Sequence, residues 1–302
     1  MFLQRTLRKR VVVEGIGLHT GEPATLTFCP APPDTGIYIV RKDMPGSPAI
    51  STRAEFVTAT TNATTLGGES FSVSTVEHCL SALTAFRIDN LFIELSGPEI
   101  PIVDGSAKPF VDAILEAGMA EQEIPRKYVF IDEPVYVGNE EKYAYVKPYN
   151  GLRVTCTIEF PHPKIGHQTI DIDINEHTYT RKICSARTFG FIKDVEMLQS
   201  KGLIRGGSLD NAIVLDNQDI LNPEGLRFAD EFVRHKVLDA LGDLVMLGRP
   251  MLGHLVLYKA GHDVMNTLVH KVLSSPESYR LIELGTEIPD TTAKGRHLWA
   301  FN

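Results

Sequence analysis

The decapeptide "RHKVLDALGD", residues 234–243, places one histidine and two aspartates four residues apart. His235, Asp239 and Asp243 would share one side of a helix, because residues four apart are neighbours there. Two interpretations fit this row: a solvated polar face, or a metal site beside an acid–base pair. Apolar residues at positions 233, 237, 241 and 244 put the row beside a buried stripe. The two aspartates repel each other at this spacing, so we expect a divalent metal at Asp239 and a protonated imidazole at Asp243.

A second helix is predicted over residues 74–86 and carries Glu77 and His78. Glu77 fits a capping box with Ser74, and His78 alone could be a hydrogen-bonded core histidine. With the other helix, however, His78 completes a set of two histidines and one carboxylate, as in catalytic zinc sites. Glu77 beside such a metal would be a natural base for a water molecule. Spacing alone leaves iron open, because iron oxygenases use the same donor set.

Composition narrows the class of protein. The 302 residues favour two domains over one, and 43% hydrophobic with 23% charged residues is an ordinary globular balance. A net charge of −8 argues against a nucleic-acid surface, and no apolar run is long enough for a transmembrane segment. The four cysteines form no C-x-x-C pair, which favours buried thiols in a reducing compartment and hence a cytoplasmic protein. We expect a monomer.

The predicted elements occur in a repeated order. The first third is rich in strands, followed by the helix 74–86, a strand, a helix at 104–118 and a linker at 122–127. The later part again begins with strands. It then continues with a short helix at 194–202, a strand at 211–215, a long helix at 224–248, a strand at 254–260 and a helix at 262–275. A faint internal echo, "TLTFCPAPPDTGIYI" against "TCTIEFPHPKIGHQTIDI", fits two similar units with a site between them.

Seven longer motifs carry a specific resemblance. They are "STVEH", "EIPIVDGSAKPF", "KPYNG", "ARTFGF", "GLIRGGSLDNAIV", "FADEFVRHKVLDALGDL" and "YKAGH", in this order. Together, over residues 3–275, they resemble the zinc-dependent UDP-3-O-acyl-N-acetylglucosamine deacetylases, which catalyse the committed step of lipid A biosynthesis. The H-K-x-x-D helix differs from the H-E-x-x-H helix of zinc peptidases.

The resemblance implies an α+β fold of two similar domains, each a β-sheet layered with α-helices, with the helices meeting at the domain interface. We expect an N-terminal domain at 1–124 with the Glu77–His78 helix. A C-terminal domain at 128–275 would carry the second helix and an acyl-passage insert, and 276–302 would be an irregular tail. The resemblance also implies one Zn²⁺ ion held by His78, His235 and Asp239, with Glu77 as general base.

The remaining catalytic roles follow from the same resemblance. His262 in "YKAGH" would be the general acid, oriented by Asp243. Thr188 would help to hold the oxyanion, with Lys236 close by. The reaction would release acetate and leave a free 2-amine on the sugar of a UDP-3-O-acyl-N-acetylglucosamine.

Substrate contacts are also implied by the resemblance. The UDP or sugar-phosphate part of the substrate would be contacted by Lys142, Phe160 and Lys259. A passage for the acyl chain would be lined by Leu18, Phe189, Phe191, Gly207 and Ser208. His19 would contact the substrate or make a structural hydrogen bond, and from its residues alone "RTFGFI" also fits plain strand core. Two other functions remain open: a zinc or iron hydrolase of another amide, and a nucleotide-sugar or lipid-binding protein without turnover.

Overall fold

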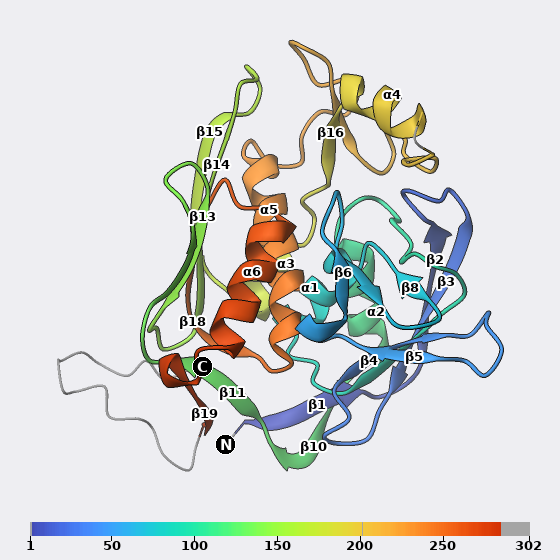
Figure 1. The fold of residues 1–302 in the computed structure, drawn as a ribbon. Helices are drawn as coiled ribbons and strands as arrows, with labels where there is room; N and C mark the ends of the chain where they lie inside the picture. The colour runs from blue at the N-terminus through green and yellow to red at the C-terminus, as the bar shows by residue number, and fades with distance from the viewer. Residues whose placement is uncertain (1, 201, 285–302) are drawn as a thin grey trace.

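Two large β-sheets flank a central group of helices (Figure 1). The computed structural model describes residues 2–200 and 202–284. This arrangement confirms the predicted α+β class, with sheets layered against helices. None of the helices in the described ranges is long and apolar enough to cross a membrane.

The first sheet has five strands, and its buried face carries alternate residues of each strand. In the strand at Pro23–Pro30, for example, Leu26 and Phe28 are fully buried and Thr27 between them is not. This period of two is what a sheet with one covered face requires. In spatial order the strands are β2 (Val11–Ile16), β3 (Pro23–Pro30), β9 (Leu91–Leu95), β4 (Ile37–Arg41) and β5 (Ala49–Ser51).

The second sheet has seven strands and lies on the other side of the helices (Figure 1). A path of five strands runs β12 (Val135–Gly138), β13 (Tyr143–Lys147), β18 (Met251–Tyr258), β11 (Lys127–Ile131) and β19 (Tyr279–Glu283). Off this path, β14 (Leu152–Phe160) pairs with β18 and with β15 (Gly166–Asp173). Strand β18 connects the sheet, because it pairs with β13 in antiparallel and with β11 and β14 in parallel orientation.

Three smaller strand groups complete the described sheets. They are β1 (Leu3–Leu7) with β10 (Met119–Pro125), β6 (Val57–Ala59) with β7 (Thr65–Gly67) and β8 (Ser72–Val73), and β16 (Phe189–Phe191) with β17 (Ile213–Leu215). The β16–β17 pair and α4 (Ile192–Ser200) project together from the rest of the molecule (Figure 1).

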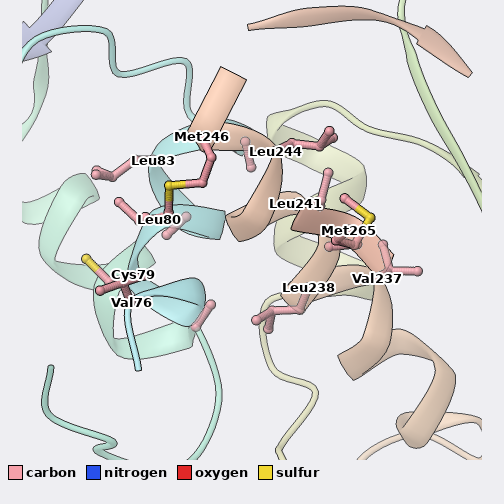
Figure 2. Close-up of a cluster of buried hydrophobic side chains, with 14 of the residues drawn as sticks. Val76, Cys79, Leu80, Leu83, Val237, Leu238, Leu241, Leu244, Met246 and Met265 are labelled. Carbon is pink, nitrogen blue, oxygen red and sulfur yellow. The ribbon is translucent and has the colours of Figure 1, made fainter. Parts of the chain in front are cut away.

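The helices form the layer between the sheets. They are α1 (Glu77–Ala85), α2 (Lys108–Ala117), α3 (Glu176–Lys182), α5 (Glu231–Asp243) and α6 (His262–Leu273), with 3₁₀ turns η1 (Ala54–Phe56), η2 (Leu244–Leu247) and η3 (Pro276–Ser278). Helix α1 packs directly against α5. Figure 2 shows the buried apolar side chains around the two helices, among them Leu80 and Leu83 of α1 and Leu238 and Leu241 of α5. Each fully buried leucine contributes about 1.5–3 kcal/mol of transfer free energy.

Three predicted boundaries were wrong. The expected linker at 122–127 is mostly β10, which pairs with β1, because a short two-stranded ribbon tolerates a proline at its end. The expected helix at 224–248 begins only at Glu231, since Gly225 lies at φ +70 in a turn, and after Asp243 it tightens into η2. Part of the expected irregular tail is β19, and its residues 285–302 lie outside the described ranges.

Gly242 allows the close approach of α5 to α1. A methyl group at this position would overlap the backbone carbonyl of Glu77. Inside a helix, glycine to alanine ordinarily stabilises by about 1 kcal/mol. We predict the opposite sign here: Gly242→Ala should lower the free energy of unfolding by about 1–3 kcal/mol through overpacking.

Denaturant unfolding of Gly242→Ala would measure this effect. Gly68→Ala is the matched control, because its added methyl group meets only Ile50, at 3.9 Å. The control should stay within about 0.5 kcal/mol of the wild type. A stability gain in Gly242→Ala would show that α1 and α5 are not in close contact.

Candidate active site

The two central helices bring His78, His235 and Asp239 together. His78 lies in the first turn of α1, and the other two lie one turn apart on α5. One ligand atom from each lies within 4.8 Å of the others, and all three side chains are buried. From Oδ1 of Asp239, Nε2 of His235 is 3.2 Å away and Nε2 of His78 is 3.6 Å away.

A backbone contact fixes the orientation of the His235 ring. Its Nδ1 lies 3.0 Å from the carbonyl oxygen of Ala186, which can only accept a hydrogen bond, so Nδ1 carries the proton. The lone pair of Nε2 therefore faces Asp239. Burial lowers the pKa of His235 to about 3, which keeps the ring neutral, as a metal ligand must be.

The Asp239 carboxylate has one oxygen without a hydrogen-bond partner. Oδ1 is buried and unpartnered within the described residues, whereas Oδ2 accepts from Nζ of Lys236. Burial raises the pKa of Asp239, but the adjacent positive charge of Lys236 opposes this effect, and the pKa lies well below its usual range. An ionised, unpartnered oxygen beside two imidazole nitrogens fits a divalent cation. The donor set suits zinc, and iron sites use the same one.

Glu77 does not form the capping box that its sequence also fitted. Helix α1 begins at Glu77 without a side-chain cap, and the amide of Ser74 donates to Pro98 instead. Oε2 of Glu77 accepts a hydrogen bond from the amide of Thr64 at 3.1 Å. Burial raises the pKa of Glu77, and the nearby His262 partly opposes this effect. Glu77 is thus a buried carboxyl group next to the metal-ligand set.

His262, the first residue of α6, completes an acid–base cluster. Its Nδ1 donates to Oδ2 of Asp243 at 2.8 Å, and its Nε2 lies 3.8 Å from Oε1 of Glu77. Burial lowers the pKa of His262, but Asp243, Glu77 and Asp239 outweigh it and raise the pKa to about 10. A helix N-terminus disfavours a positive charge. Here the carboxylates prevail, so the ring is protonated at neutral pH.

Thr188 is held next to α5 by a buried ion pair that the sequence did not reveal. The amide and Nε of Arg187 both donate to Oε1 of Glu231 at 3.0 Å, and Glu231 is fully buried. The amide of Thr188 donates to the carbonyl of Gly105 at 2.8 Å. In the sequence, Arg187 and Glu231 are ordinary charged residues 44 positions apart, so only the fold identifies the pair.

Three phenylalanines that were predicted to contact the substrate, one for the UDP part and two for the acyl passage, form one contact group beside the metal ligands. The Phe160 ring lies 5.6 Å from Phe189 and 6.1 Å from Phe191, centroid to centroid. The Phe189 ring lies 5.0 Å from Phe232 and 6.4 Å from His235. Phe189 therefore links the apolar group to a candidate metal ligand.

The other residues that were predicted to line the acyl passage lie where two loops meet. The carbonyl of Leu18 accepts from the amide of Gly206, and Leu18 Cδ1 would lie 3.7 Å from a Cβ at Gly207. Ser208 follows in the same loop, and its amide donates to Oδ1 of Asn211.

His19 belongs to the first of these loops, which a buried carboxylate anchors. The amide of His19 donates to Oε1 of Glu99, which also accepts from the Thr75 hydroxyl, both at 2.9 Å. Among the described residues, Nδ1 of His19 is buried without a partner, so this atom makes no structural hydrogen bond. The sequence did not reveal Glu99 either, because its role depends on loops distant along the chain.

Lys142 and Lys259 are exposed at strand ends of the second sheet, one just before β13 and the other just after β18. Lys142 pairs with Asp263, the residue after His262, at 2.8 Å. Lys259 lies 3.5 Å from Glu159, next to Phe160. Both ammonium groups therefore contact carboxylates of residues that are adjacent in sequence to predicted site residues.

Comparison with known proteins identifies the family. The family model described as UDP-3-O-acyl N-acetylglycosamine deacetylase matches residues 4–274. The chain belongs to this family. It is 64% identical over 290 residues to the UDP-3-O-acyl-N-acetylglucosamine deacetylase of Bdellovibrio bacteriovorus, covering 96% of each chain. The protein of the same name from Myxococcus xanthus is 50% identical over 279 residues, which cover 92% of this chain and 89% of the relative. The one from Shewanella oneidensis is 45% identical over 290 residues, which cover 95% of each chain.

Membership of the deacetylase family confirms the resemblance drawn from the seven motifs. Four of these motifs supply elements at the site: "STVEH" supplies the start of α1, and the longest motif supplies α5. "ARTFGF" leads into β16, and "YKAGH" ends at the first residue of α6. These four motifs thus contribute to one buried cluster of titratable groups.

Two aspartates on α5 allow a matched test of the ligand set. Asp239 and Asp243 are both buried, one turn apart, but only Asp239 belongs to the candidate metal group. Asp239→Asn should weaken metal binding at least tenfold, since even the loss of a residue that hydrogen-bonds to a metal ligand typically costs about 10–100-fold, and within the described ranges Asp243 bonds to no residue of the ligand set. Asp243→Asn should keep its metal. Elemental analysis after dialysis measures both, and equal metal loss in the two variants would contradict the assignment.

Proposed function

We propose that this chain hydrolyses the N-acetyl group of UDP-3-O-(3-hydroxyacyl)-N-acetylglucosamine. The products are acetate and the free 2-amine, in the committed step of lipid A biosynthesis. The observation that carries the proposal is the buried cluster that joins the metal-ligand group to Glu77 and to the His262–Asp243 pair. Relatives over nearly the whole chain bear the name of this deacetylase.

The proposed cofactor is one Zn²⁺ ion held by His78, His235 and Asp239. When bound, zinc supplies Lewis-acid polarisation of the amide carbonyl and lowers the pKa of water. Oδ1 of Asp239, which has no hydrogen-bond partner in the described part of the chain, and the neutral His235 ring support this assignment. Reconstitution of metal-depleted protein with zinc or with ferrous iron would show which metal supports turnover.

Glu77 and His262 divide the proton transfers between them. Glu77 takes a proton from the attacking water, and its burial raises its pKa, which makes it a stronger base than an exposed glutamate. His262 gives its proton to the leaving nitrogen as the C–N bond breaks. Asp243 orients the ring through Nδ1 and stabilises its positive charge.

Thr188 and Lys236 stabilise the developing oxyanion in this proposal. The Arg187–Glu231 pair fixes the backbone that carries Thr188. Lys236 provides a positive charge at the metal-ligand group, where it already contacts Asp239. Preorganised charge of this kind is usually the largest catalytic contribution.

The substrate contacts are assigned by their chemistry. Lys142 and Lys259 supply positive charge for the diphosphate, next to Phe160. The passage for the acyl chain is lined by Phe189, Phe191, Leu18, Gly207 and Ser208. His19 contacts the substrate through its ring, whose Nδ1 has no hydrogen-bond partner within residues 2–200 and 202–284. The aromatic contacts of Phe189 and Phe191 with Phe160 support an apolar wall at the entrance to the site.

We further propose two similar domains, at 1–124 and 128–275, in a monomeric protein of the cytoplasm. The two sheets, each covered by helices, support the division. All four cysteines are free and buried, which suits a reducing compartment.

The variant Glu77→Gln distinguishes a role of Glu77 as general base from a role as metal ligand or as structural residue. We predict that acetate release falls by about 100-fold or more, the usual contribution of general base catalysis, while metal content stays normal. Glu116→Gln, an exposed change on α2, is the control and should retain activity. If wild-type protein binds the nucleotide sugar but releases no acetate, the chain is a binding protein and the proposed function is wrong.

The acyl passage predicts strong selection for acylated substrate. Each buried methylene contributes about 0.8 kcal/mol, so ten give about 8 kcal/mol as an upper bound. Half of this free energy corresponds to a kcat/KM for the acylated substrate that is roughly a thousandfold higher than that for UDP-N-acetylglucosamine. Phe191→Ala should reduce that ratio about tenfold or more, whereas Tyr136→Ala, which removes an exposed ring on β12, should leave it unchanged.

Steady-state kinetics on both substrates measure the ratio. A large residue at Gly207 would be a poorer test, because even a Cβ there would overlap Ile204 and disturb the loop. Equal kcat/KM of wild-type protein for the two substrates would rule out the passage.

A further inference from the structure

Thr64 lies at the centre of the acid–base cluster, although no motif points to it. It precedes β7 and is buried, with 2% of its surface exposed. Its amide donates to Oε2 of Glu77 at 3.1 Å, and its carbonyl accepts from the amide of Val76, at the start of α1. The Thr64 backbone is therefore bound both to α1 and to the carboxyl group that α1 carries.

The side chain of Thr64 reaches the other half of the cluster. Its hydroxyl donates to Oδ1 of Asp243 at 2.7 Å and lies 3.2 Å from Nδ1 of His262. Oδ2 of Asp243 accepts from that same Nδ1 at 2.8 Å. Each oxygen of the Asp243 carboxylate thus has one hydrogen bond, and rotation of the carboxylate would break both.

These contacts join three elements through one residue. Glu77 comes from α1, Asp243 from α5 and His262 from α6. The separation of 3.8 Å between Oε1 of Glu77 and Nε2 of His262 is thereby tied to the position of Thr64. A shift of one side chain relative to the others would disturb a reaction that requires both in contact with the same substrate group.

We propose that Thr64 is a positioning residue that sets the spacing of Glu77 and His262, its amide holding the first and its hydroxyl holding the second through Asp243. The proposal rests on the proposed function, because it gives these two side chains their roles. Thr64 itself donates no proton to the substrate and accepts none from it.

The two contacts of Thr64 can be separated by mutation. Thr64→Val keeps the shape and the amide but removes the hydroxyl, whereas Thr64→Ser keeps the hydroxyl. Thr65→Val, the same change at the next position, is the matched control. Thr65 is only partly buried, and among the described residues no hydrogen bond joins its hydroxyl to Glu77, Asp243 or His262.

The kinetic result distinguishes positioning from a structural role. Thr64→Val should lower kcat about 10- to 100-fold, as expected for a lost hydrogen bond to a charged group, with KM within about twofold. Thr64→Ser should restore most of kcat, and Thr65→Val should match the wild type. Metal content should stay normal in all three variants. Lower melting temperature with unchanged kcat in Thr64→Val would assign the residue a structural role only and overturn the proposal.

A double-mutant cycle tests the route through Asp243. If the hydroxyl acts only through this carboxylate, Thr64→Val should add no further loss of kcat to Asp243→Asn. Additive losses would contradict the proposal.

A spectroscopic measurement tests the proposal without activity. The Nδ1 proton of His262 should give a downfield resonance in ¹⁵N-histidine-labelled protein, assigned by its loss in His262→Gln. The resonance should persist in Thr64→Ser and be broadened or lost in Thr64→Val, and an unchanged resonance in Thr64→Val would overturn the proposal. If the wild type releases no acetate, the proposed function fails, while this resonance still decides whether Thr64 holds the His262–Asp243 pair.

Discussion

The packing of α1 against α5 is the constraint on which the rest of the structure depends. Each helix carries part of the candidate metal-ligand group. The distance between the helices therefore determines whether His78 can bind the same metal ion as His235 and Asp239. Buried leucines on both helices contribute to the free energy of folding, and Gly242 permits the backbone of α5 to approach the carbonyl of Glu77. A side chain at Gly242 would separate the two helices at the position where their chemistry must meet.

Close packing of this kind also concentrates charge where water is excluded. Glu77, Asp239 and Asp243 are three buried carboxyl groups, and an isolated buried charge is costly unless it is paired. Lys236 balances Asp239, and His262 balances Asp243. Oδ1 of Asp239 still lacks a hydrogen-bond partner among the described residues, and a bound cation would compensate it. The repulsion between two aspartates, visible in the sequence, is thus relieved in two different ways.

The sequence predicted the parts of this site that lie within one helix or one motif. The period of α5 placed His235, Asp239 and Asp243 on one side, and the structure brings His78 and His262 to them as expected. Thr64, Glu99 and the Arg187–Glu231 pair could not be predicted, because their partners are distant in sequence. The same limit applies to the fold: β10 and β19 are strands because β1 and β11 pair with them, which no local pattern of polarity encodes.

Glu77 and His262 show why the cluster must be rigid as well as buried. Oε1 and Nε2 lie 3.8 Å apart, yet the proposed reaction needs one group deprotonated and the other protonated at the same pH. The environments meet this need in different ways, since burial raises the pKa of Glu77 and carboxylates raise that of His262 to about 10. The charge on His262 in turn lowers the pKa of Glu77 and helps to keep it ionised. Such mutual stabilisation falls steeply with distance, so an acid and a base this close together require the backbone and side-chain contacts that hold them in place.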